Sequence, residues 1–513
     1  MFQTRFNHCH LKMAFLIKWL KAQELLKIFV RFKHGSNHWS VIRKEKTHKN
    51  RALAYFDDFY DKVYGKAWKD IRTALLQEEN KYIAVVNNFS DVKRIQTSLE
   101  NSGAINLKLI YDAFMENVQD QRFQKKSKET IKLNDRMDNI ISERQISKVQ
   151  SVYPIDYKSS PDSLTYTENN DSNININKSL ELVHLKSIAE DSNDVNIDSN
   201  RIVLPSDGLA GLYEFVPVTK LKGMDEWVLE SEHYEYYQKA ADFKIPVEKE
   251  KILSFPKHLK LYTYEEFSEE KFSVPKKGST GVLDYYLFDG GSILPILALD
   301  IQLGDYVLDM CAAPGGKTLT ILQTLMPNLV VANDLSQSRV NRIKKVLNQY
   351  IADIGQLNDK LFITEEDARK INDKDVYNKI LVDVPCTTDR HVLHENNNNI
   401  FKPTRIKERL RMPEIQADIL FNALQLVTVG GTVVYSTCSL SPIQNDGVIQ
   451  MALKRMWEES NTVIIVKDMS DALDPLQTLF NFGNFGLKHG HIVIPTIGYN
   501  WGPMYFCKMV KLK

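Results

Sequence analysis

The second half of the sequence predicts an α/β fold, a doubly wound and mostly parallel sheet with helices on both faces. Short apolar runs, each ending in polar residues, alternate with helical patterns from about residue 300 onward. A Gly-rich turn, Asp309-Met-Cys-Ala-Ala-Pro-Gly-Gly-Lys317, joins the first run to a helical pattern. In such folds the carboxyl ends of the parallel strands are where ligands bind, so we expect a site at this turn.

The apolar runs predict the strands, and the last two are expected to form an antiparallel edge near the C-terminus. The predicted strands span 306–309, 329–334, 361–364, 380–383, 432–436, 463–466, 492–495 and 504–510. Helical patterns lie between them, at 317–325, 336–351, 404–426 and 442–457.

Upstream of this domain, which we place at 273–513, the chain changes character three times. Residues 50–120 predict a helical N-terminal segment, because aromatic and apolar side chains recur every three or four residues. We expect that aromatic stripe to be core, not a base-stacking platform. Residues 121–204 are polar and rich in Lys, then in Asn, Asp and Ser, which predicts a disordered insert. Residues 205–272 regain aromatic residues and prolines, as in an ordered, loop-rich extension.

Residues 1–45 are basic and amphipathic, as is typical of a mitochondrial presequence. The first 50 residues hold 11 Lys and Arg against two Glu, a net charge of +9. The other residues therefore hold 55 basic and 63 acidic side chains, a net charge of −8. A surface helix or a basic arm that touches RNA is the alternative for the N-terminus.

The cysteine pattern argues against a disulfide framework and against a metal site. The five cysteines are odd in number and show neither CxxC nor Cys/His ligand spacing. We therefore expect a reducing compartment and no bound metal. No run of about 18 apolar residues occurs, so we expect no membrane span.

The Gly-rich turn predicts a cofactor site. Its small residues let a ligand approach the backbone, and the following helix presents free N–H groups. The pattern is neither GxGxxG nor a Walker loop, which disfavours dinucleotides and nucleoside triphosphates. Asp334 and Asp367 follow the next two strands, where carboxylates can bind the ribose hydroxyls and the adenine amino group of an adenosyl ligand. For each aspartate alone, helix N-capping is the alternative.

Two cysteines follow predicted strands, in Asp383-Val-Pro-Cys386 and in Tyr435-Ser-Thr-Cys438-Ser. Two thiols and a carboxylate beside a cofactor turn favour covalent catalysis on an electron-poor ring. A thiolate that adds to one carbon of such a ring makes the neighbouring carbon nucleophilic, and Asp383, if protonated, can donate to a ring nitrogen. Buried cysteines are more often inert, which is the interpretation that suits Cys9 and Cys507.

These peptides resemble the NSUN family of S-adenosylmethionine-dependent RNA cytosine-5 methyltransferases. The resemblance runs from about Ser273 to the C-terminus. The peptides 383–391, 397–402 and 502–508, with 81–89 in the N-terminal segment, are similar to the mitochondrial ribosomal RNA subfamily. The fold implied is the Rossmann-like fold of methyltransferases that use S-adenosylmethionine.

The resemblance implies that Cys438 is the nucleophile and that Cys386 serves the release step. DNA cytosine methyltransferases use the cysteine of the Pro-Cys motif instead, but the Thr-Cys-Ser peptide favours Cys438. Amino methyltransferases are excluded because they carry an aromatic residue at the position of Cys386. Contacts to S-adenosyl-L-methionine are implied for Gly315, Gly316, Lys317, Asp334, Arg339, Asp367, Ala368 and Asp383. Ala368 stands where the subfamily has Gly.

The resemblance also implies a substrate and a partner. The substrate is the small-subunit ribosomal RNA of the mitochondrial matrix, whose methylation supports ribosome biogenesis. The partner is a helical-repeat protein of the mitochondrial termination-factor family. A ribosome-assembly factor whose methylation is incidental is the alternative, and the absent dinucleotide fingerprint disfavours an oxidoreductase.

A basic run near the site is an equal candidate for a phosphate-binding rim and for a solvated helix face. It comprises Lys402, Arg405, Lys407, Arg409 and Arg411. His391 and His394 follow the Pro-Cys peptide and invite a general-base role, but packing or hydrogen bonding is the simpler explanation.

Overall fold

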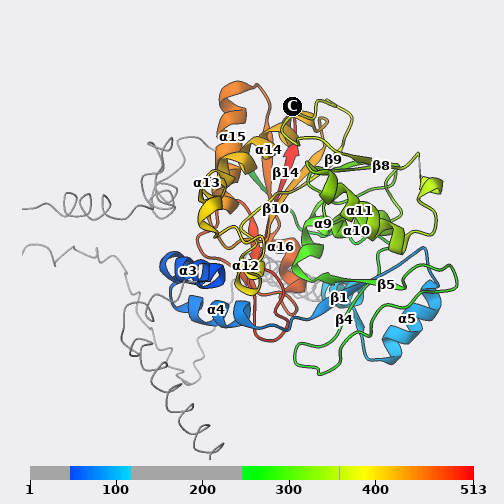
Figure 1. Ribbon diagram of the computed structural model, residues 1–513. Coiled ribbons are helices and arrows are strands. Elements are labelled where there is room, and N and C mark those ends of the chain that lie inside the picture. Colours follow the sequence, from blue (N-terminus) through cyan, green and yellow to red (C-terminus); the bar gives the residue numbers. More distant parts are fainter. Residues whose placement is uncertain (1–46, 117–244, 358) are drawn as a thin grey trace, which may run out of the picture. The chain divides into compact units, whose positions relative to one another are not determined.

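The computed structural model describes residues 47–116, 245–357 and 359–513. Its larger sheet contains five parallel strands in the order β8-β7-β6-β9-β10 (Figure 1). These strands are β6 (Tyr306–Asp309), β7 (Leu329–Asn333), β8 (Leu361–Thr364), β9 (Lys379–Asp383) and β10 (Thr432–Thr437). Each agrees with a predicted strand to within one residue. The strand order reverses between β6 and β9, and this switch point is where an open α/β sheet binds its ligands.

The other part of this sheet is antiparallel. Strand β14 (Met504–Lys511) pairs with β10 on one side, and on its other side with β11 (Ile464–Asp468) and β13 (His491–Val493). The short strands β3 (Val247–Lys249) and β12 (Phe482–Gly483) extend β11 and β13. The predicted antiparallel part is therefore present, but its C-terminal strand lies inside the sheet and not at the edge. Residues 504–509 are all buried, which suits an internal strand covered on both faces.

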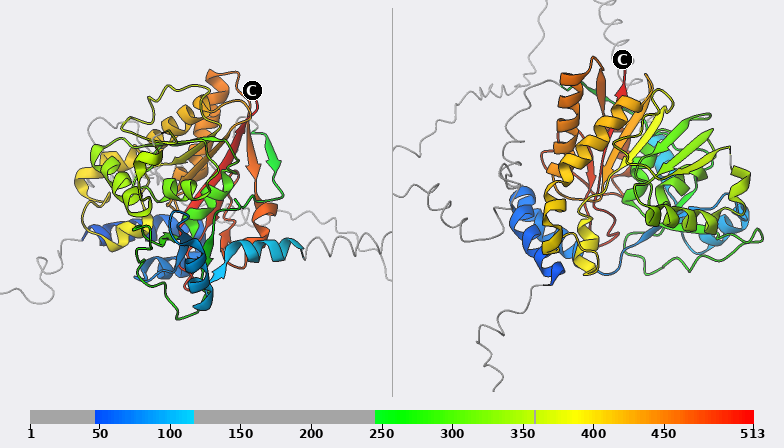
Figure 2. Two further views of the ribbon diagram at one scale, coloured as in Figure 1. Left: turned by 90° about the vertical axis from the view of Figure 1, so that its right-hand side faces the viewer. Right: turned by 45° about the horizontal axis from the view of Figure 1, so that its top comes forward.

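Alternate residues of the strands face two hydrophobic layers. Val433 and Ile380 contribute to one layer, and their neighbours Val434 and Leu381 contribute to the other. The first layer includes α14 (Met412–Leu426) and α15 (Val448–Glu459), and the second includes α9 (Leu294–Ala298), α10 (Gly316–Gln323) and α11 (Gln337–Tyr350). In the right-hand view of Figure 2, the orange helices lie on one side of the strands and the green helices on the other.

The predicted helix 404–426 is interrupted. The structure has α13 (Ile406–Leu410) and then α14, with Arg411 between them. Pro413 lies in the first turn of α14, where its missing N–H costs nothing but where a continuous helix would need that donor. The proline therefore explains the break.

The N-terminal aromatic stripe is core, as predicted. It lies on α3 (His48–Tyr64) and α4 (Trp68–Leu76), which contact α12 (Asp389–His394). Phe56 and Tyr60 are fully buried and their rings stack with centroids 4.9 Å apart. These side chains join the layer that contains α14 and α15, so the helical segment packs against the catalytic domain.

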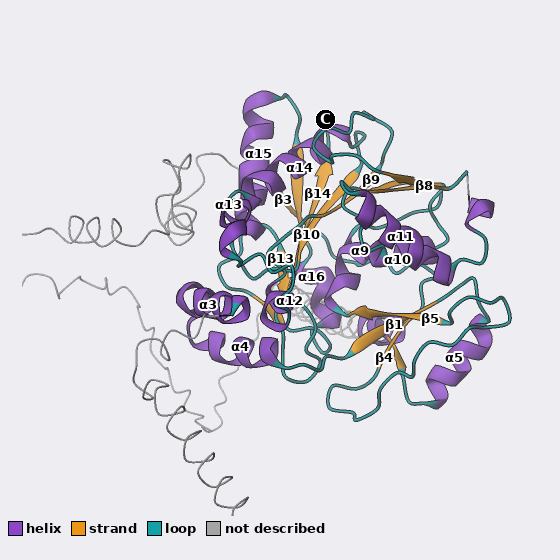
Figure 3. Cartoon of the chain, viewed as in Figure 1, coloured by secondary structure: helices purple, strands orange, loops and turns teal. Residues whose placement is uncertain are grey.

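The prediction of helix throughout 50–120 is wrong for residues 82–86. This stretch is strand β1, the centre of a second sheet ordered β2-β4-β1-β5, which is drawn apart from the large sheet in Figure 3. Its neighbours are β4 (Leu261–Thr263) and β5 (Tyr285–Asp289), β2 (Ile105–Asn106) lies beyond β4, and α5 (Val92–Asn101) packs on one face. Ile83 to Val86 are all buried because both faces of β1 are covered: Ile83 and Val85 pack in one hydrophobic cluster, and Ala84 and Val86 in another. Strands that follow more than 170 residues later pair with both edges of β1. The extension and the catalytic domain thus share this sheet.

Several predicted segments lie outside the described residues: the presequence (1–45), the insert (121–204) and the first part of the extension. In the part of the chain that is described, no helix is long and apolar enough to cross a membrane. The same residues contain no cluster of three or more His, Cys, Asp or Glu side chains that could hold a metal ion.

Candidate active site

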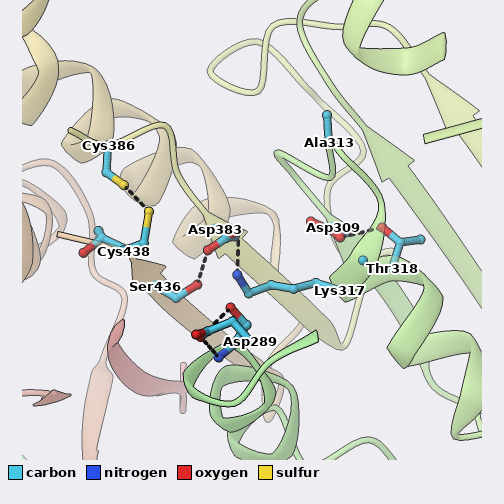
Figure 4. Close-up of polar contacts among 12 residues, drawn as sticks. Asp289, Asp309, Ala313, Lys317, Thr318, Asp383, Cys386, Ser436 and Cys438 are labelled. Carbon is cyan, nitrogen blue, oxygen red and sulfur yellow. Dashed lines mark hydrogen bonds and ion pairs between the residues drawn. The ribbon is translucent and has the colours of Figure 1, made fainter. Parts of the chain in front are cut away.

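The structure brings Cys386 and Cys438 together at the carboxyl ends of two paired strands. Cys386 follows β9 and Cys438 follows β10, and the parallel register places Asp383 opposite Ser436. The two Sγ atoms lie 3.0 Å apart, and both cysteines are free thiols (Figure 4). The pairing of β9 with β10, and not the separation of 52 residues in the sequence, creates this contact.

The surroundings keep the Cys438 sulfur protonated. The hydrogen bond with Cys386, burial and the negative charge of Asp383 raise the pKa of Cys438 well above its ordinary value, while the positive charge of Lys317 opposes them. A thiol attacks only as its thiolate, so Cys438 must lose a proton before it can act.

Asp383 is held by two groups. Lys317, in the first turn of α10, places its Nζ 2.7 Å from Asp383 Oδ2, and the Ser436 hydroxyl donates to Oδ1 at 2.7 Å (Figure 4). Burial lowers the pKa of Lys317, but the carboxylate of Asp383 outweighs burial and the pKa of Lys317 is raised overall. Lys317 is therefore a charged ammonium next to the thiol pair, and it connects the Gly-rich turn to the catalytic strand.

The Gly-rich turn is shaped for close approach of its backbone. Gly315 has φ +109°, a left-handed conformation that favours glycine, and a Cβ there would lie 3.2 Å from Cα of Ile343. A Cβ on Gly316 would lie 2.7 Å from the hydroxyl of Tyr286. The backbone conformation therefore requires glycine at position 315, whereas a side chain at position 316 would have to displace the ring of Tyr286.

Asp309, at the end of β6, has one oxygen with a partner and one without. The Thr318 hydroxyl donates to Oδ2 at 2.7 Å, whereas Oδ1 is buried and has no hydrogen-bond partner. Burial is the largest cause that raises the pKa of Asp309, to about 7. A buried acceptor of this kind calls for a donor, which a bound ligand can provide.

The two aspartates predicted to hold an adenosyl group follow β7 and β8. Asp334 accepts from Arg339 Nε at 2.8 Å and from the Ala313 N–H at 3.2 Å. It therefore joins the Gly-rich turn to α11, and it does not cap that helix, whose N-cap residue is Ser336. Arg339, another residue that the resemblance implies to contact the cofactor, lies beside this carboxylate.

Asp367 is engaged locally. Arg369 donates to its carboxylate through the backbone N–H, Nε and Nη2, at 3.1, 3.0 and 2.7 Å. The hydrogen bond from Arg369 is the largest cause that lowers the pKa of Asp367. Ala368 is buried, and its carbonyl accepts from Asn422. This local turn explains Asp367 without a ligand, although 18% of its side chain remains exposed.

Sequence reasoning missed the residue that ties the two thiol peptides together. Asp389 is fully buried, and its carboxylate accepts from the hydroxyls of Thr387 and Ser439 and from Tyr60 of α3. It also accepts from the Leu440 N–H at 2.7 Å. The sequence signal was the Thr-Thr-Asp that follows Cys386, but its role depends on contacts with distant segments.

The positions of the two histidines near Cys386 do not support a role as general base. His394 Nε2 lies 2.7 Å from the Leu75 carbonyl, so this ring joins α12 to α4. His391 is exposed on α12. Packing and hydrogen bonding, the simpler of the two explanations, account for His394.

The basic run is not uniformly available to phosphates. Arg405 pairs with Glu408 and donates to the Asn398 carbonyl at 2.7 Å. The Arg409 guanidinium lies 4.6 Å above the ring of Tyr55 and a similar distance above another aromatic ring. Lys407 and Arg411 are exposed, and Lys402 is partly exposed. Two members of the predicted rim thus hold the local structure together.

The family model and two of the relatives that this chain matches are named as rRNA methyltransferases. The family model for "16S rRNA methyltransferase RsmB/F" matches residues 296–474. The chain is 34% identical over 466 residues to the 5-cytosine rRNA methyltransferase NSUN4 of Xenopus tropicalis, covering 90% of each chain. It is 44% identical over 257 residues to the protein of that name from Mus musculus, covering 50% of this chain and 67% of that one.

A crystal structure of NSun6 from Pyrococcus horikoshii with SFG is 23% identical, at a TM-score of 0.36, and covers 45% of this chain and 54% of that one.

Proposed function

Because the chain belongs to the family of 5-cytosine rRNA methyltransferases, we propose that it methylates C5 of a cytosine in mitochondrial small-subunit ribosomal RNA through a covalent bond from Cys438. Its fold and its family make it a methyltransferase, and its methyl donor is S-adenosyl-L-methionine. The observation that carries the proposal is the thiol pair, 3.0 Å apart, beside the Lys317–Asp383 ion pair.

The residues at the Gly-rich turn fit the methyl donor. Gly315 and Gly316 leave a cradle that a Cβ would fill, and Asp309 presents a buried acceptor without a partner. Asp334, next to the turn, offers a carboxylate for ribose hydroxyls. Asp367 and Ala368 follow β8, which is the strand next to β7 in the sheet. When bound there, S-adenosyl-L-methionine supplies an electrophilic methyl group.

Cys438 begins the reaction on the base. Its thiol loses a proton, and the thiolate forms a bond to C6 of cytosine, which moves the electron pair of the C5–C6 double bond toward N3. C5 thereby becomes nucleophilic. The surroundings raise the pKa of Cys438, and the positive charge of Lys317 opposes that shift and favours the thiolate.

N3 must receive a proton as the adduct forms, and the structure constrains its source. Asp383 can donate to N3 only when it is protonated, yet here its carboxylate accepts from Ser436 and pairs with Lys317. Either the base displaces the Lys317 ammonium and Asp383 takes up a proton, or Lys317 itself supplies the proton. Both routes use the same pair of residues, so both require the pair to be intact before the base enters.

Cys386 serves the release step. After methylation the C5 proton leaves, the bond between Cys438 and C6 breaks, and the departing sulfur needs a proton. Cys386, 3.0 Å away, can give its proton to that sulfur and accept the C5 proton as a thiolate. The Cys386 proton thus ends on Cys438 and the C5 proton ends on Cys386, so both thiols are restored. N3 returns the proton that it received to its donor, and the proton that Cys438 lost at the outset is the one that the overall reaction releases.

The place and the partner belong to the same proposal. The NSUN4 names support ribosomal RNA, and other relatives of this chain are named mitochondrial tRNA methyltransferases. The charge asymmetry of the sequence supports import through residues 1–45 into the matrix. Outside the first 50 residues the net charge is −8, so a helical-repeat partner of the mitochondrial termination-factor family would supply the phosphate contacts.

Bisulfite sequencing of mitochondrial ribosomal RNA tests the proposal. Depletion of the protein should remove one 5-methylcytosine from the small-subunit RNA, and re-expression should restore it. Re-expression of Cys438→Ala separates the two roles: rescue of ribosome assembly without methylation would favour the assembly-factor alternative. An unchanged methylation pattern after depletion would contradict the proposed substrate. A reporter fused to residues 1–45 that stays outside mitochondria would contradict the import signal.

A further inference from the structure

Asp389 is a buried carboxylate that no cation neutralises among the described residues. It is 0% exposed, and none of the ion pairs in that part of the chain includes it. Burial is the largest cause that raises its pKa, while the hydrogen bonds from Thr387, Tyr60, Leu440 and Ser439 oppose the shift. A buried charge of this kind persists only where several donors are fixed around it.

The donors come from three segments that are far apart in the sequence. Tyr60 of α3 donates to Oδ2 at 2.6 Å across 329 residues. The Leu440 N–H and the Ser439 hydroxyl, just after Cys438, donate at 2.7 and 3.2 Å, and the Thr387 hydroxyl, just after Cys386, donates to Oδ1. The Asp389 N–H in turn donates to the Cys438 carbonyl at 3.3 Å.

This arrangement fixes the two peptides that carry the thiols. The hydroxyl oxygens of Thr387 and Ser439 also lie 2.9 Å from each other. Thr388, between Thr387 and Asp389, has φ +49°, a left-handed conformation that is unfavourable for threonine. The contacts of Asp389 hold this strained turn, and the turn sets where the chain leaves Cys386.

We propose that Asp389, oriented by Tyr60, is a positioning residue that sets the placement of the Cys386 and Cys438 sulfur atoms, so that α3 is part of the catalytic apparatus. This inference rests on the proposed function, because the two thiols act at successive steps on the same base. An error of about 1 Å in such a placement can cost about 100-fold in rate.

Tyr60 is suited to orienting a carboxylate. Its ring is fixed by stacking on Phe56 and by an edge contact with Trp68, at centroid distances of 4.9 and 5.3 Å. Burial, followed by the negative charge of Asp389, raises the pKa of Tyr60 well above its ordinary value. The hydroxyl therefore remains a donor at every pH at which the enzyme works.

The test compares Tyr60→Phe and Asp389→Asn with Tyr377→Phe in the full chain. Tyr377 is a matched control, because its hydroxyl also donates to an aspartate, Asp373, at 3.0 Å. It precedes β9, whereas Cys386 follows it, so the two residues lie beyond opposite ends of this strand. Single-turnover methylation of a mitochondrial small-subunit RNA transcript should slow about tenfold in Tyr60→Phe and about 100-fold in Asp389→Asn. The affinity for S-adenosyl-L-methionine should stay within twofold.

A second measurement does not depend on RNA. The hydrogen bond with Cys386 is the largest cause of the raised pKa of Cys438, so loosening the pair should lower that pKa. Iodoacetamide at pH 8 should therefore alkylate Cys438 severalfold faster in Asp389→Asn than in the wild type, as followed by mass spectrometry. Tyr377→Phe should match the wild type in both measurements.

The outcomes are distinct. A wild-type protein that methylates no RNA would contradict the proposed function, and the alkylation rates would still test the inference. An active wild type, together with a folded Asp389→Asn variant whose methylation and alkylation rates are unchanged, would overturn the inference. Equal losses in Tyr377→Phe would show that any lost tyrosine–aspartate hydrogen bond has the same effect, and would overturn it as well.

Discussion

The two halves of the active site are built in different ways. In the cofactor half, the aspartates that follow β7 and β8 are held by close neighbours: Asp334 by Arg339, five residues on, and Asp367 by Arg369, two residues on. In the thiol half, at β9 and β10, Asp383 and Asp389 rely on Lys317 and Tyr60 from distant segments. The cofactor half is thus assembled by local turns, and the thiol half by the tertiary fold.

This difference predicts how damage spreads. A lesion in a local turn should weaken one function and leave the other half intact. A substitution in the thiol half should also disturb the other segments that meet there, because each of its groups contacts several others in one network. Lys317 is the exception to this division, because it lies in the first turn of α10 in the cofactor half and its ammonium pairs with Asp383 in the thiol half.

The largest effect is expected for the two thiols. Cys438→Ala should abolish methyl transfer, because the residue that forms the bond to C6 is gone. Cys386→Ala should still attack and methylate, but should accumulate a covalent complex with RNA that survives denaturation. Gel shift under denaturing conditions measures both outcomes. A persistent adduct in Cys438→Ala, with none in Cys386→Ala, would exchange the two assignments.

The next effect tests the link between the halves. Lys317→Met leaves Asp383 without its ammonium partner in a site where the lysine side chain is only 10% exposed. Because 28% of the Asp383 side chain is exposed, we expect a modest loss of about 1–3 kcal/mol in unfolding free energy. Methylation and donor affinity should both fall.

The double variant Lys317→Met, Asp383→Asn serves as its control. It removes the uncompensated charge, so its urea midpoint should recover toward that of the wild type while methylation stays low. If the single variant is as stable as the wild type and loses only donor affinity, Lys317 belongs to the cofactor half alone.

Asp309 gives a pH-dependent effect confined to the cofactor half. Its pKa in the folded chain is about 7, above its ordinary value of 3.8, because it is buried. The folded state therefore binds the proton more tightly, and the stability present below about pH 4 is progressively lost as pH rises to about 7. The loss has a slope of up to about 1.4 kcal/mol per pH unit.

Asp309→Asn removes this titration. Without methyl donor, its melting temperature should exceed that of the wild type at pH 8, and the gap should shrink steadily toward pH 5. Cys438 alkylation should not change, since the lesion is local. A gap that does not depend on pH would show that Asp309 does not titrate in this range.

The smallest effect concerns RNA contacts at the outer side of the thiol half. Arg411→Gln should weaken binding to RNA of any sequence, with a salt slope lower by about one, as expected for one lost phosphate contact. Arg409→Gln should instead lower the melting temperature, because its guanidinium packs on Tyr55. Fluorescence anisotropy against salt separates the two. Equal losses of affinity without any loss of stability would place both arginines on the RNA.

More of the cofactor half than of the thiol half could be predicted from the sequence, because its contacts join residues that are closer together in the chain. The Gly-rich turn and the position of Asp334 at a strand end could be read from the residue pattern, and the family resemblance added Arg339. Cys386 and Cys438 were found because each sits in a distinctive peptide, but their contact requires the pairing of β9 with β10. Nothing in the spacing links Asp389 to Tyr60.

The errors in the fold and in the basic run have different causes. Residues 82–86, Tyr-Ile-Ala-Val-Val, are rich in β-branched residues that favour a strand, but the helical spacing on either side of them was extended across this stretch. The sequence shows how many basic residues follow Lys402, but it does not show which of them pair with other side chains. Arg405 turns toward Glu408, and Arg409 toward aromatic rings that come partly from α3.

The position of β14 has a consequence for synthesis on the ribosome. Strand β10, which carries the nucleophile at its end, emerges about 70 residues before β14 covers its free edge. At about 5–20 residues per second, that edge and its unpaired backbone N–H and C=O groups stay uncovered for several seconds. We therefore expect the nascent chain to be a client for chaperones during this interval, because the free edge of β10 can pair with other chains until β14 has been made.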